Sequence, residues 1–210
     1  MRIATWNVNN VVARMERLLP WLETAQPDVV CLQELKVGTA EVPVAAFEAA
    51  GYAVAARGDG RWNGVAILSR VGIDDVQHDL ADQPAWDGVV EPRAIAATCG
   101  GVRVWSLYVP NGRTVDDAHY AYKLEWLPAL RAQAETDLAV GVPLAILGDF
   151  NVAPTDDDVW DIAQFTDSTH VTPAERGPAL MAERTASRVL SVCSRQRAPS
   201  TCSVNVMPRP

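Results

Sequence analysis

The first fifty residues alternate between short apolar runs and longer amphipathic segments. Residues 2–8 predict a strand, and Asn9 or Asn10 follows where a helix N-cap is needed. The next segment repeats its apolar residues at helical spacing. Residues 29–32 predict a second buried strand and residues 44–50 a second helix. Strands that alternate with helices in this way indicate an α/β fold.

Farther along the chain, short strand candidates follow one another with turns between them. They cover residues 52–56, 64–69, 94–98 and 102–108. The polar, proline-containing segment 74–91 predicts a loop. Residues 116–140 predict a long amphipathic helix, whose inward face carries Tyr120, Leu124, Leu127 and Leu130. A block of consecutive strands with helices on either side of it predicts stacked sheets with helices outside.

The stretch that follows the next apolar run carries the clearest chemistry. Residues 142–146 predict a buried strand, and Gly148 then permits a sharp turn or a close approach of the backbone to another group. Asp149 and Asn151 are two positions apart, so on an extended backbone they project to the same side. Such a pair is suited to hold a hard cation and a water molecule. A strand followed by an Asx-type turn explains the same residues equally well.

Three other apolar runs end in polar residues of the same kind, namely Asn7, Glu34 and Tyr108. Taken singly, each has an ordinary explanation: a helix cap, a solvated acid at a helix start, and a core aromatic with its hydroxyl at the rim. The cations near these segments are most simply read as surface charges; they are Lys36, Arg93 and Lys123. If the ends of these strands meet in one cleft, the combination of residues indicates a site for a metal and a phosphate more specifically than any one residue does.

Composition narrows the class of protein. The chain has 210 residues, of which 49% are apolar, and it predicts a single domain with a sizeable core. Its net charge of −8 argues against a protein that coats nucleic acid, but not against an enzyme that meets a phosphate at one metal-loaded site. No run is apolar enough to cross a membrane. We expect no signal peptide, a cytoplasmic location, and buried thiols at Cys31 and Cys99.

Five blocks of the sequence, in this order, resemble the exonuclease III family of DNA-repair nucleases, within the endonuclease/exonuclease/phosphatase superfamily. The blocks are residues 4–9 (ATWNVN), 27–36 (PDVVCLQELK), 63–70 (NGVAILSR), 107–112 (LYVPNG) and 147–154 (LGDFNVAP). The lysine after Gln-Glu and the Pro-Asn-Gly after the tyrosine favour the DNA-repair branch over the lipid and inositol phosphatase branches. The resemblance implies a four-layer α/β/β/α sandwich of the DNase I type.

The resemblance also implies an activity and a set of roles. The activity is Mg²⁺- or Mn²⁺-dependent hydrolysis of phosphodiesters, by a 3′→5′ exonuclease and abasic-site endonuclease of base excision repair. We also expect the protein to be a monomer. Its substrate is double-stranded DNA with abasic sites or 3′ ends. Glu34 and Asn7 would bind the metal, together with Asp149 and Asn151. Asp149 would orient or deprotonate the attacking water, Asn151 would hold water or a phosphate oxygen, and Tyr108 would contact the scissile phosphate.

The sequence departs from the family toward its C-terminal end. The family's pattern finishes with Ser-Asp-His, whose histidine meets the phosphate, whereas the histidines here are His78, His119 and His170 and none lies in such a motif. We assign His170 no role. The nuclease domain is predicted over residues 1–177, incomplete in its last strands, and residues 178–210 are predicted to form a poorly ordered Arg/Ser-rich tail without strand or helix.

Two alternatives remain open at this point. The chain could be a truncated, catalytically weak or inactive pseudo-nuclease that lacks the terminal Ser-Asp-His. It could also keep the superfamily's chemistry but act on RNA or on a small phosphodiester, since the loops expected to choose the substrate, residues 74–91 and 113–119, cannot be decoded from the sequence.

Overall fold

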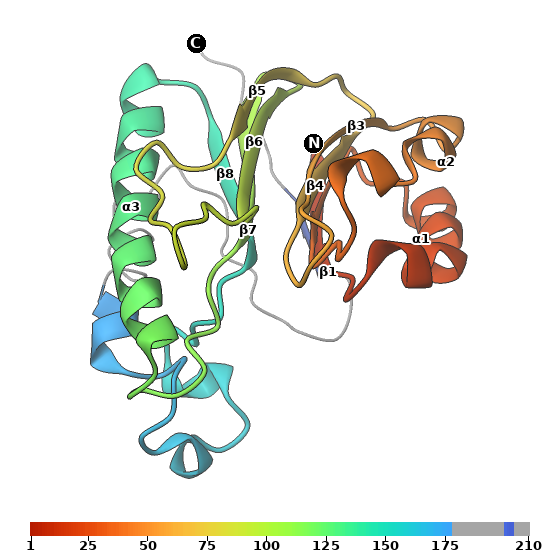
Figure 1. The fold of residues 1–210 in the computed structure, drawn as a ribbon. Coiled ribbons are helices and arrows are strands. Elements are labelled where there is room, and N and C mark those ends of the chain that lie inside the picture. The colour runs from red at the N-terminus through yellow and green to blue at the C-terminus, as the bar shows by residue number, and fades with distance from the viewer. Residues whose placement is uncertain (178–199, 204–210) are drawn as a thin grey trace.

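Two β-sheets stack face to face, with helices covering both outer faces (Figure 1). The computed structural model describes residues 1–177 and 200–203. Helices α1 (Val11–Ala25) and α2 (Val44–Ala49) cover one sheet, and α3 (Ala118–Val140) covers the other. The predicted four-layer α/β/β/α sandwich is therefore confirmed. No helix in the described ranges is long and apolar enough to cross a membrane.

The first sheet has the strand order β3-β4-β2-β1-β9. Its strands are β1 (Arg2–Asn7), β2 (Val29–Gln33), β3 (Ala53–Arg57), β4 (Val65–Ser69) and β9 (Ser200–Ser203). β1 and β2 are parallel, in a register that places Asn7 opposite Gln33, and the other pairs are antiparallel. Because parallel neighbours end at the same edge, Asn7 and the residue after Gln33 emerge side by side.

The second sheet has the strand order β5-β6-β7-β8. Its strands are β5 (Asp74–His78), β6 (Ala94–Cys99), β7 (Val102–Tyr108) and β8 (Leu144–Asp149). β7 and β8 are parallel, and their register places Tyr108 opposite Asp149. The second sheet thus brings a phenol and a carboxylate together at one edge, as the first sheet does with an amide and a carboxylate.

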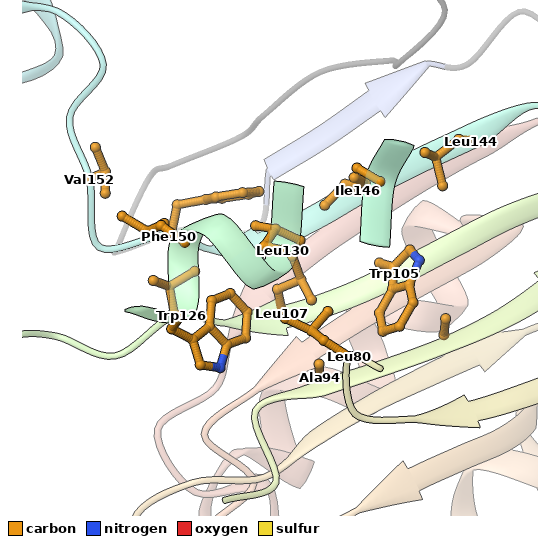
Figure 2. Packing of buried hydrophobic residues seen from close by; sticks show 14 of the residues in the cluster. Leu80, Ala94, Trp105, Leu107, Trp126, Leu130, Leu144, Ile146, Phe150 and Val152 are labelled. Carbon is orange, nitrogen blue, oxygen red and sulfur yellow. The ribbon is translucent and has the colours of Figure 1, made fainter. Parts of the chain in front are cut away.

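Three apolar layers hold the sheets and helices together. One lies between the two sheets and contains the buried thiols of Cys31 and Cys99, as predicted. A second lies between α1, α2 and the first sheet. The third lies between α3 and the second sheet and is built around Trp105 and Trp126 (Figure 2). The indole nitrogen of Trp105 donates to Asp137 at 2.6 Å, so this polar atom is buried with a partner.

The layer between the sheets also contains a short chain of buried hydrogen bonds. Gln33 Nε2 donates to Ser106 Oγ at 3.1 Å, and Ser106 Oγ donates to the main-chain oxygen of Leu32 at 3.1 Å. The hydroxyl of Thr5 donates to Gln33 Oε1 at 3.2 Å. Directional bonds between β2 and β7 fix the alignment of the two sheets in a way that apolar packing alone does not.

The structure differs from the sequence-based prediction in three elements. Residues 74–78 form β5 inside the segment predicted as a loop. The prediction missed this exposed edge strand because its residues lack an alternating apolar pattern. Residues 200–203 form β9, although the tail was predicted to contain no strand; the rest of that tail, residues 178–199 and 204–210, lies outside the described residues. On α3, Tyr120 and Leu124 are only half-buried, while Tyr122, Lys123 and Trp126 are buried with Leu127 and Leu130.

Candidate active site

The five residues singled out in the sequence lie around one polar cavity, where the adjacent ends of both sheets meet. The cavity has a volume of about 470 Å³ and is lined by Trp6, Asn7, Asn9, Arg14, Arg17, Glu34, Tyr108, Asn111, Asp149 and Asn151. The two arginines come from α1 and bring positive charge to a chain whose net charge is −8. The cavity is thus lined with carboxylates, amides and guanidinium groups.

Asn7 connects the two carboxylates of the cavity. Its Nδ2 donates to Glu34 Oε1 at 2.6 Å and to Asp149 Oδ2 at 2.9 Å, while its Oδ1 accepts from the main-chain N–H of Asn9 at 3.1 Å. These bonds orient the amide, so that nitrogen faces the acids. Since Asn7 ends β1 in the first sheet and Asp149 ends β8 in the second, the bond between them crosses from one sheet to the other.

Glu34 sits just after β2 in an unusual backbone conformation. Its φ is +55°, in the left-handed region that glutamate rarely adopts. Lys36 pairs with Glu34 Oε2 at 2.9 Å. Burial raises the pKa of Glu34, but hydrogen bonds from Asn7 and Lys36 outweigh burial and hold the pKa below its ordinary range. The carboxylate is therefore charged and fixed in direction.

Asp149 and Asn151 project together from the end of β8, as predicted. Asp149 Oδ1 accepts from the main-chain N–H of Asn151 at 3.1 Å, which is the Asx-turn geometry, and Asn151 Nδ2 donates to the main-chain oxygen of Val109 at 2.9 Å. Asp149 and Asn151 therefore form an Asx turn and also line the cavity. Burial raises the pKa of Asp149, the negative charge of Glu34 adds to this, and the hydrogen bond from Asn7 opposes it.

Gly148 is needed because a side chain at this point of β8 would point into the main chain of β7. A Cβ atom there would lie 2.0 Å from the main-chain oxygen of Leu107, and the φ of +151° is one that L-residues rarely adopt. The close approach predicted for this glycine is therefore confirmed. It places Asp149 beside Tyr108 across the parallel pair.

Tyr108 is held by a buried arginine. The guanidinium of Arg93 lies 5.1 Å from the ring centre of Tyr108 and donates to its main-chain oxygen at 3.2 Å. Arg93 in turn pairs with Glu91 at 2.7 Å, and Asn63 donates to the same carboxylate at 2.7 Å. Burial and the negative charge of Glu34 raise the pKa of Tyr108 far above neutrality. The phenol is therefore protonated and able to donate a hydrogen bond.

The Glu91–Arg93 pair gives a prediction for stability against pH. Burial raises the pKa of Glu91, but Arg93 and Asn63 outweigh it and keep the pKa in the folded protein below its ordinary value of 4.5. The pair therefore stabilises the fold above that pH, and its contribution is lost as the pH falls. Glu91→Gln is expected to lower the free energy of unfolding by about 1–2 kcal/mol at pH 7. Urea titrations of both proteins should show this gap shrinking below about pH 4.5.

The matched control is Glu135→Gln, in an exposed ion pair with Arg131 on α3. This change is expected to cost under about 0.5 kcal/mol at either pH, because exposed pairs contribute little. A gap for Glu91→Gln that stays constant down to pH 3 would show that charge is not its source.

The structure places one residue in this region that the sequence-based reasoning had set aside. His170 Nε2 lies 3.1 Å from Asn111 Nδ2 and 3.3 Å from Asn151 Oδ1. The sequence analysis assigned His170 no role, and the structure places it in contact with two residues that line the cavity. The sequence gives no periodicity that would show this, because His170 lies in a loop that contacts the cavity only through tertiary folding. His78 is exposed on β5, and His119 is buried beside Gly112.

Two of the cations interpreted as surface charges are buried. Arg93 is only 5% exposed and Lys123 is completely buried, whereas Lys36 is half-buried, pairs with Glu34 and lies beside Trp62. Within the described ranges, no group of three or more His, Cys, Asp or Glu side chains forms a metal cluster. A cation held here would thus depend on two carboxylates and on amide oxygens.

A second cavity of about 460 Å³ adjoins the first and shares Tyr108 and Asn111 with it. Its wall combines aromatic, basic and acidic side chains: Trp62, Trp86, Arg61, Arg93, Arg113, His119, Asp59, Asp87 and Glu91. It is lined in part by the two loops expected to choose the substrate. The two adjoining cavities together therefore have a larger volume than one phosphate group needs.

Comparison with known sequences gives a consistent picture. The model of the Endonuclease/Exonuclease/phosphatase family matches residues 4–202. Exodeoxyribonuclease III of Haemophilus influenzae is 28% identical over 164 residues, which cover 76% of this chain and 60% of that protein. This chain thus spans about three fifths of the length of the curated relatives that it matches.

Comparison with solved structures extends the similarity to the fold. The 3′ phosphatase NExo from Neisseria, bound to a product DNA hairpin, is 34% identical with a TM-score of 0.81, over 88% of this chain and 70% of that chain. An AP endonuclease from Archaeoglobus fulgidus is 33% identical with a TM-score of 0.83, over the same shares of the two chains. The names of these two proteins refer to action at 3′ ends and at abasic (AP) sites, respectively.

Proposed function

This chain belongs to the Endonuclease/Exonuclease/phosphatase family, and on that premise we propose that it is a metal-dependent nuclease that hydrolyses phosphodiester bonds of DNA. The observation that carries the proposal is the bridge from Asn7 to both Glu34 and Asp149, in a cavity that also contains Tyr108 and Asn151. Its substrates are duplexes with abasic sites or 3′ ends, and its pathway is base excision repair.

The donor set suits Mg²⁺ or Mn²⁺. Glu34 and Asp149 lie within hydrogen-bond distance of the same nitrogen, and the charge of Glu34 raises the pKa of Asp149, so the cavity has negative charge that a cation would offset. Mg²⁺ prefers oxygen ligands and takes few from protein, so one or two carboxylates suffice. Glu34 would hold it through its carboxylate and Asn7 through Oδ1, which in this structure accepts from Asn9 N–H, with Asp149 and Asn151 close by. When bound, the ion polarises the phosphate and offsets the charge that develops on it.

The remaining steps fall to side chains of the chain itself. Asp149, whose pKa is raised by burial, is suited to orient the attacking water and accept its proton. Tyr108 remains protonated and can donate to a non-bridging oxygen of the phosphate. Asn151, fixed by its bond to Val109, would hold water or a phosphate oxygen.

The second cavity favours DNA over a small phosphodiester. Trp62 is 76% exposed beside Lys36, and Arg113 lies 5.6 Å from the ring centre of Trp86. Exposed aromatic and cationic groups next to a phosphate site suit a strand with stacking bases. The predicted monomeric state and cytoplasmic location belong to the same proposal.

The test is cleavage by the 210-residue chain of a duplex with one abasic site and of a duplex with a recessed 3′ end. We expect cleavage with Mg²⁺, none with EDTA, and recovery when Mg²⁺ is restored. If a folded sample cuts neither duplex, the proposal is wrong and the inactive pseudo-nuclease is favoured. Faster cleavage of an RNA duplex or of bis(4-nitrophenyl) phosphate would instead favour an enzyme that acts on RNA or on a small phosphodiester.

A further inference from the structure

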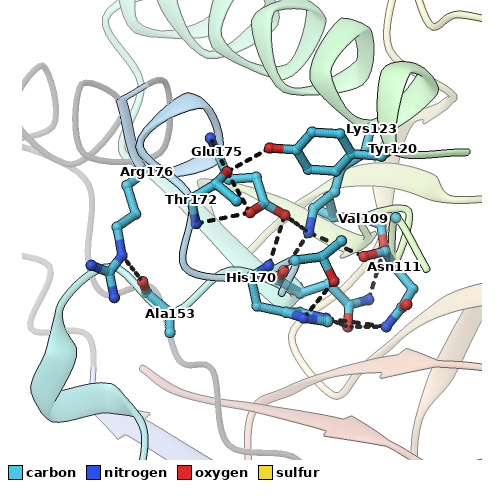
Figure 3. A network of polar contacts seen from close by, with 12 residues as sticks. Val109, Asn111, Tyr120, Lys123, Ala153, His170, Thr172, Glu175 and Arg176 are labelled. Carbon is cyan, nitrogen blue, oxygen red and sulfur yellow. Dashed lines mark hydrogen bonds and ion pairs between the residues drawn. The ribbon is translucent and has the colours of Figure 1, made fainter. Parts of the chain in front are cut away.

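Lys123 is a buried cation directly beneath the candidate active site. Its side chain is completely buried on α3. The ammonium group has three acceptors, which are the main-chain oxygens of Asn151 at 2.6 Å and Asn111 at 3.2 Å and the carboxylate of Glu175 at 2.5 Å (Figure 3). An ammonium has three donors, so Lys123 is fully hydrogen-bonded without water.

Its partner Glu175 is equally buried and equally satisfied. Oε1 also accepts from the main-chain N–H of His170 at 2.8 Å, and Oε2 accepts from the N–H and the hydroxyl of Thr172 at 3.1 and 2.7 Å. Burial raises the pKa of Glu175, but Lys123 and these donors outweigh it and hold the pKa below its ordinary value. The pair is therefore ionic.

Three segments that carry polar groups at the site meet at this pair. Asn111 follows β7, Asn151 follows β8, and His170 lies in the loop before the helical residues 173–177. Their main chains are bound by Lys123 or Glu175. On the other side, their side chains contact one another in a triangle with edges of 3.1 to 3.3 Å. Figure 3 shows Lys123 and Glu175 together with Asn111 and His170.

We propose that Lys123 and Glu175 are positioning residues, which fix the main chain under Asn111 and Asn151 so that both amide side chains face the substrate phosphate. The contact between these amides and a phosphate rests on the proposed function. Their fixed orientation does not, because it is a property of the folded chain. Neither Lys123 nor Glu175 lines the first cavity, so neither acts on the substrate directly.

The competing explanation is that the pair only stabilises the fold. Stability by itself does not require a buried ion pair, because apolar replacement of both partners is often neutral or stabilising. An apolar pair, however, cannot hold two carbonyl groups and an N–H in place. The two explanations therefore differ in what happens when both partners become apolar.

The experiment compares the wild type with the double variant Lys123→Met/Glu175→Leu, which leaves no unpaired buried charge. We expect the double variant to remain folded at the assay temperature, with a lower unfolding temperature because the main-chain groups that the pair binds lose their partners. We expect its kcat on the abasic-site duplex to be about a hundredfold lower and its KM to change little. In a background of Asn111→Ala/Asn151→Ala, the same double change is expected to lower kcat less than about twofold further, because it acts through those two amides. Wild-type kcat in the folded double variant would overturn the proposal, as would full additivity with the two alanine changes.

A second readout does not depend on activity. In ¹⁵N NMR spectra of the full chain, the side-chain NH₂ signals of Asn111 and Asn151 are expected to shift and broaden in the double variant. If the wild type cleaves nothing, the proposed function fails while these signals still decide the positioning. Unchanged signals would overturn it.

The matched control is Arg131→Met/Glu135→Leu, which removes an exposed ion pair on the same helix. Its kcat and the two amide signals are expected to match the wild type, because this pair contacts no segment of the site. A loss equal to that of the Lys123 variant would assign the effect to α3 in general and overturn the proposal.

Discussion

Replacing Glu34 with alanine, or Asp149 with asparagine, is expected to abolish Mg²⁺-dependent cleavage of the abasic-site duplex, with kcat lower by at least about a thousandfold. Glu34→Ala removes the carboxylate that Asn7 and Lys36 orient toward the cavity. Asp149→Asn keeps the shape of the side chain but removes the group proposed to accept the proton of water. The measurement is single-turnover cleavage at saturating Mg²⁺.

Stability separates this loss from unfolding. In Asp149→Asn, a half-buried charge near Glu34 disappears, so the unfolding temperature is expected to equal or exceed that of the wild type. Asp157→Asn, at an exposed position beyond β8, is the matched control and is expected to cleave at the wild-type rate. Activity retained in both Glu34→Ala and Asp149→Asn would mean that the site has been assigned to the wrong residues.

Gly148→Ala is expected to lower the free energy of unfolding by about 3 kcal/mol or more, at the upper end of overpacking effects. The added Cβ would lie 2.0 Å from the main-chain oxygen of Leu107, and no side-chain rotation can relieve a contact between backbone and Cβ. β8 would have to move away from β7, and Asp149 would move with it. Urea unfolding is the measurement, with cleavage assayed on the fraction that remains folded.

Gly177→Ala is the matched control for this substitution. Among the described residues, a Cβ there meets nothing within 4 Å, and the backbone does not require a positive φ. Its stability is expected to stay within about 0.5 kcal/mol of the wild type. If Gly148→Ala were no more destabilising than Gly177→Ala, the close approach of β8 to β7 would be wrong.

The sequence predicted much of the fold because local and tertiary signals agree there. Asn10 caps α1 as expected, its side chain accepting from Ala13 N at 3.0 Å, and β7 covers the predicted residues 102–108. The family was predicted from five blocks of sequence, and the family model confirms it. The blocks could do this because they contain the polar ends of strands, where the identity of a residue is fixed by chemistry as well as by packing.

The errors concern residues whose environment is created by distant parts of the chain. Lys123 reads as a surface charge because its partner Glu175 is 52 residues away and its other acceptors are main-chain oxygens. His170 likewise reaches Asn111 across 59 residues. β9 pairs with β1 from the other end of the described chain, and its residues have no strand pattern of their own. None of these relations leaves a periodic signal in the sequence.

The division of the site between two sheets has a consequence for which substitutions the interior can accept. The bond from Asn7 to Asp149 joins one sheet to the other, and the buried link from Gln33 to Ser106 lies behind it. A core change that conserves volume but lets one sheet slide over the other would separate the two halves of the site while leaving each half intact. Libraries of interior variants should therefore contain members that are stable yet inactive, and repacking for thermal stability must preserve sheet alignment as well as density.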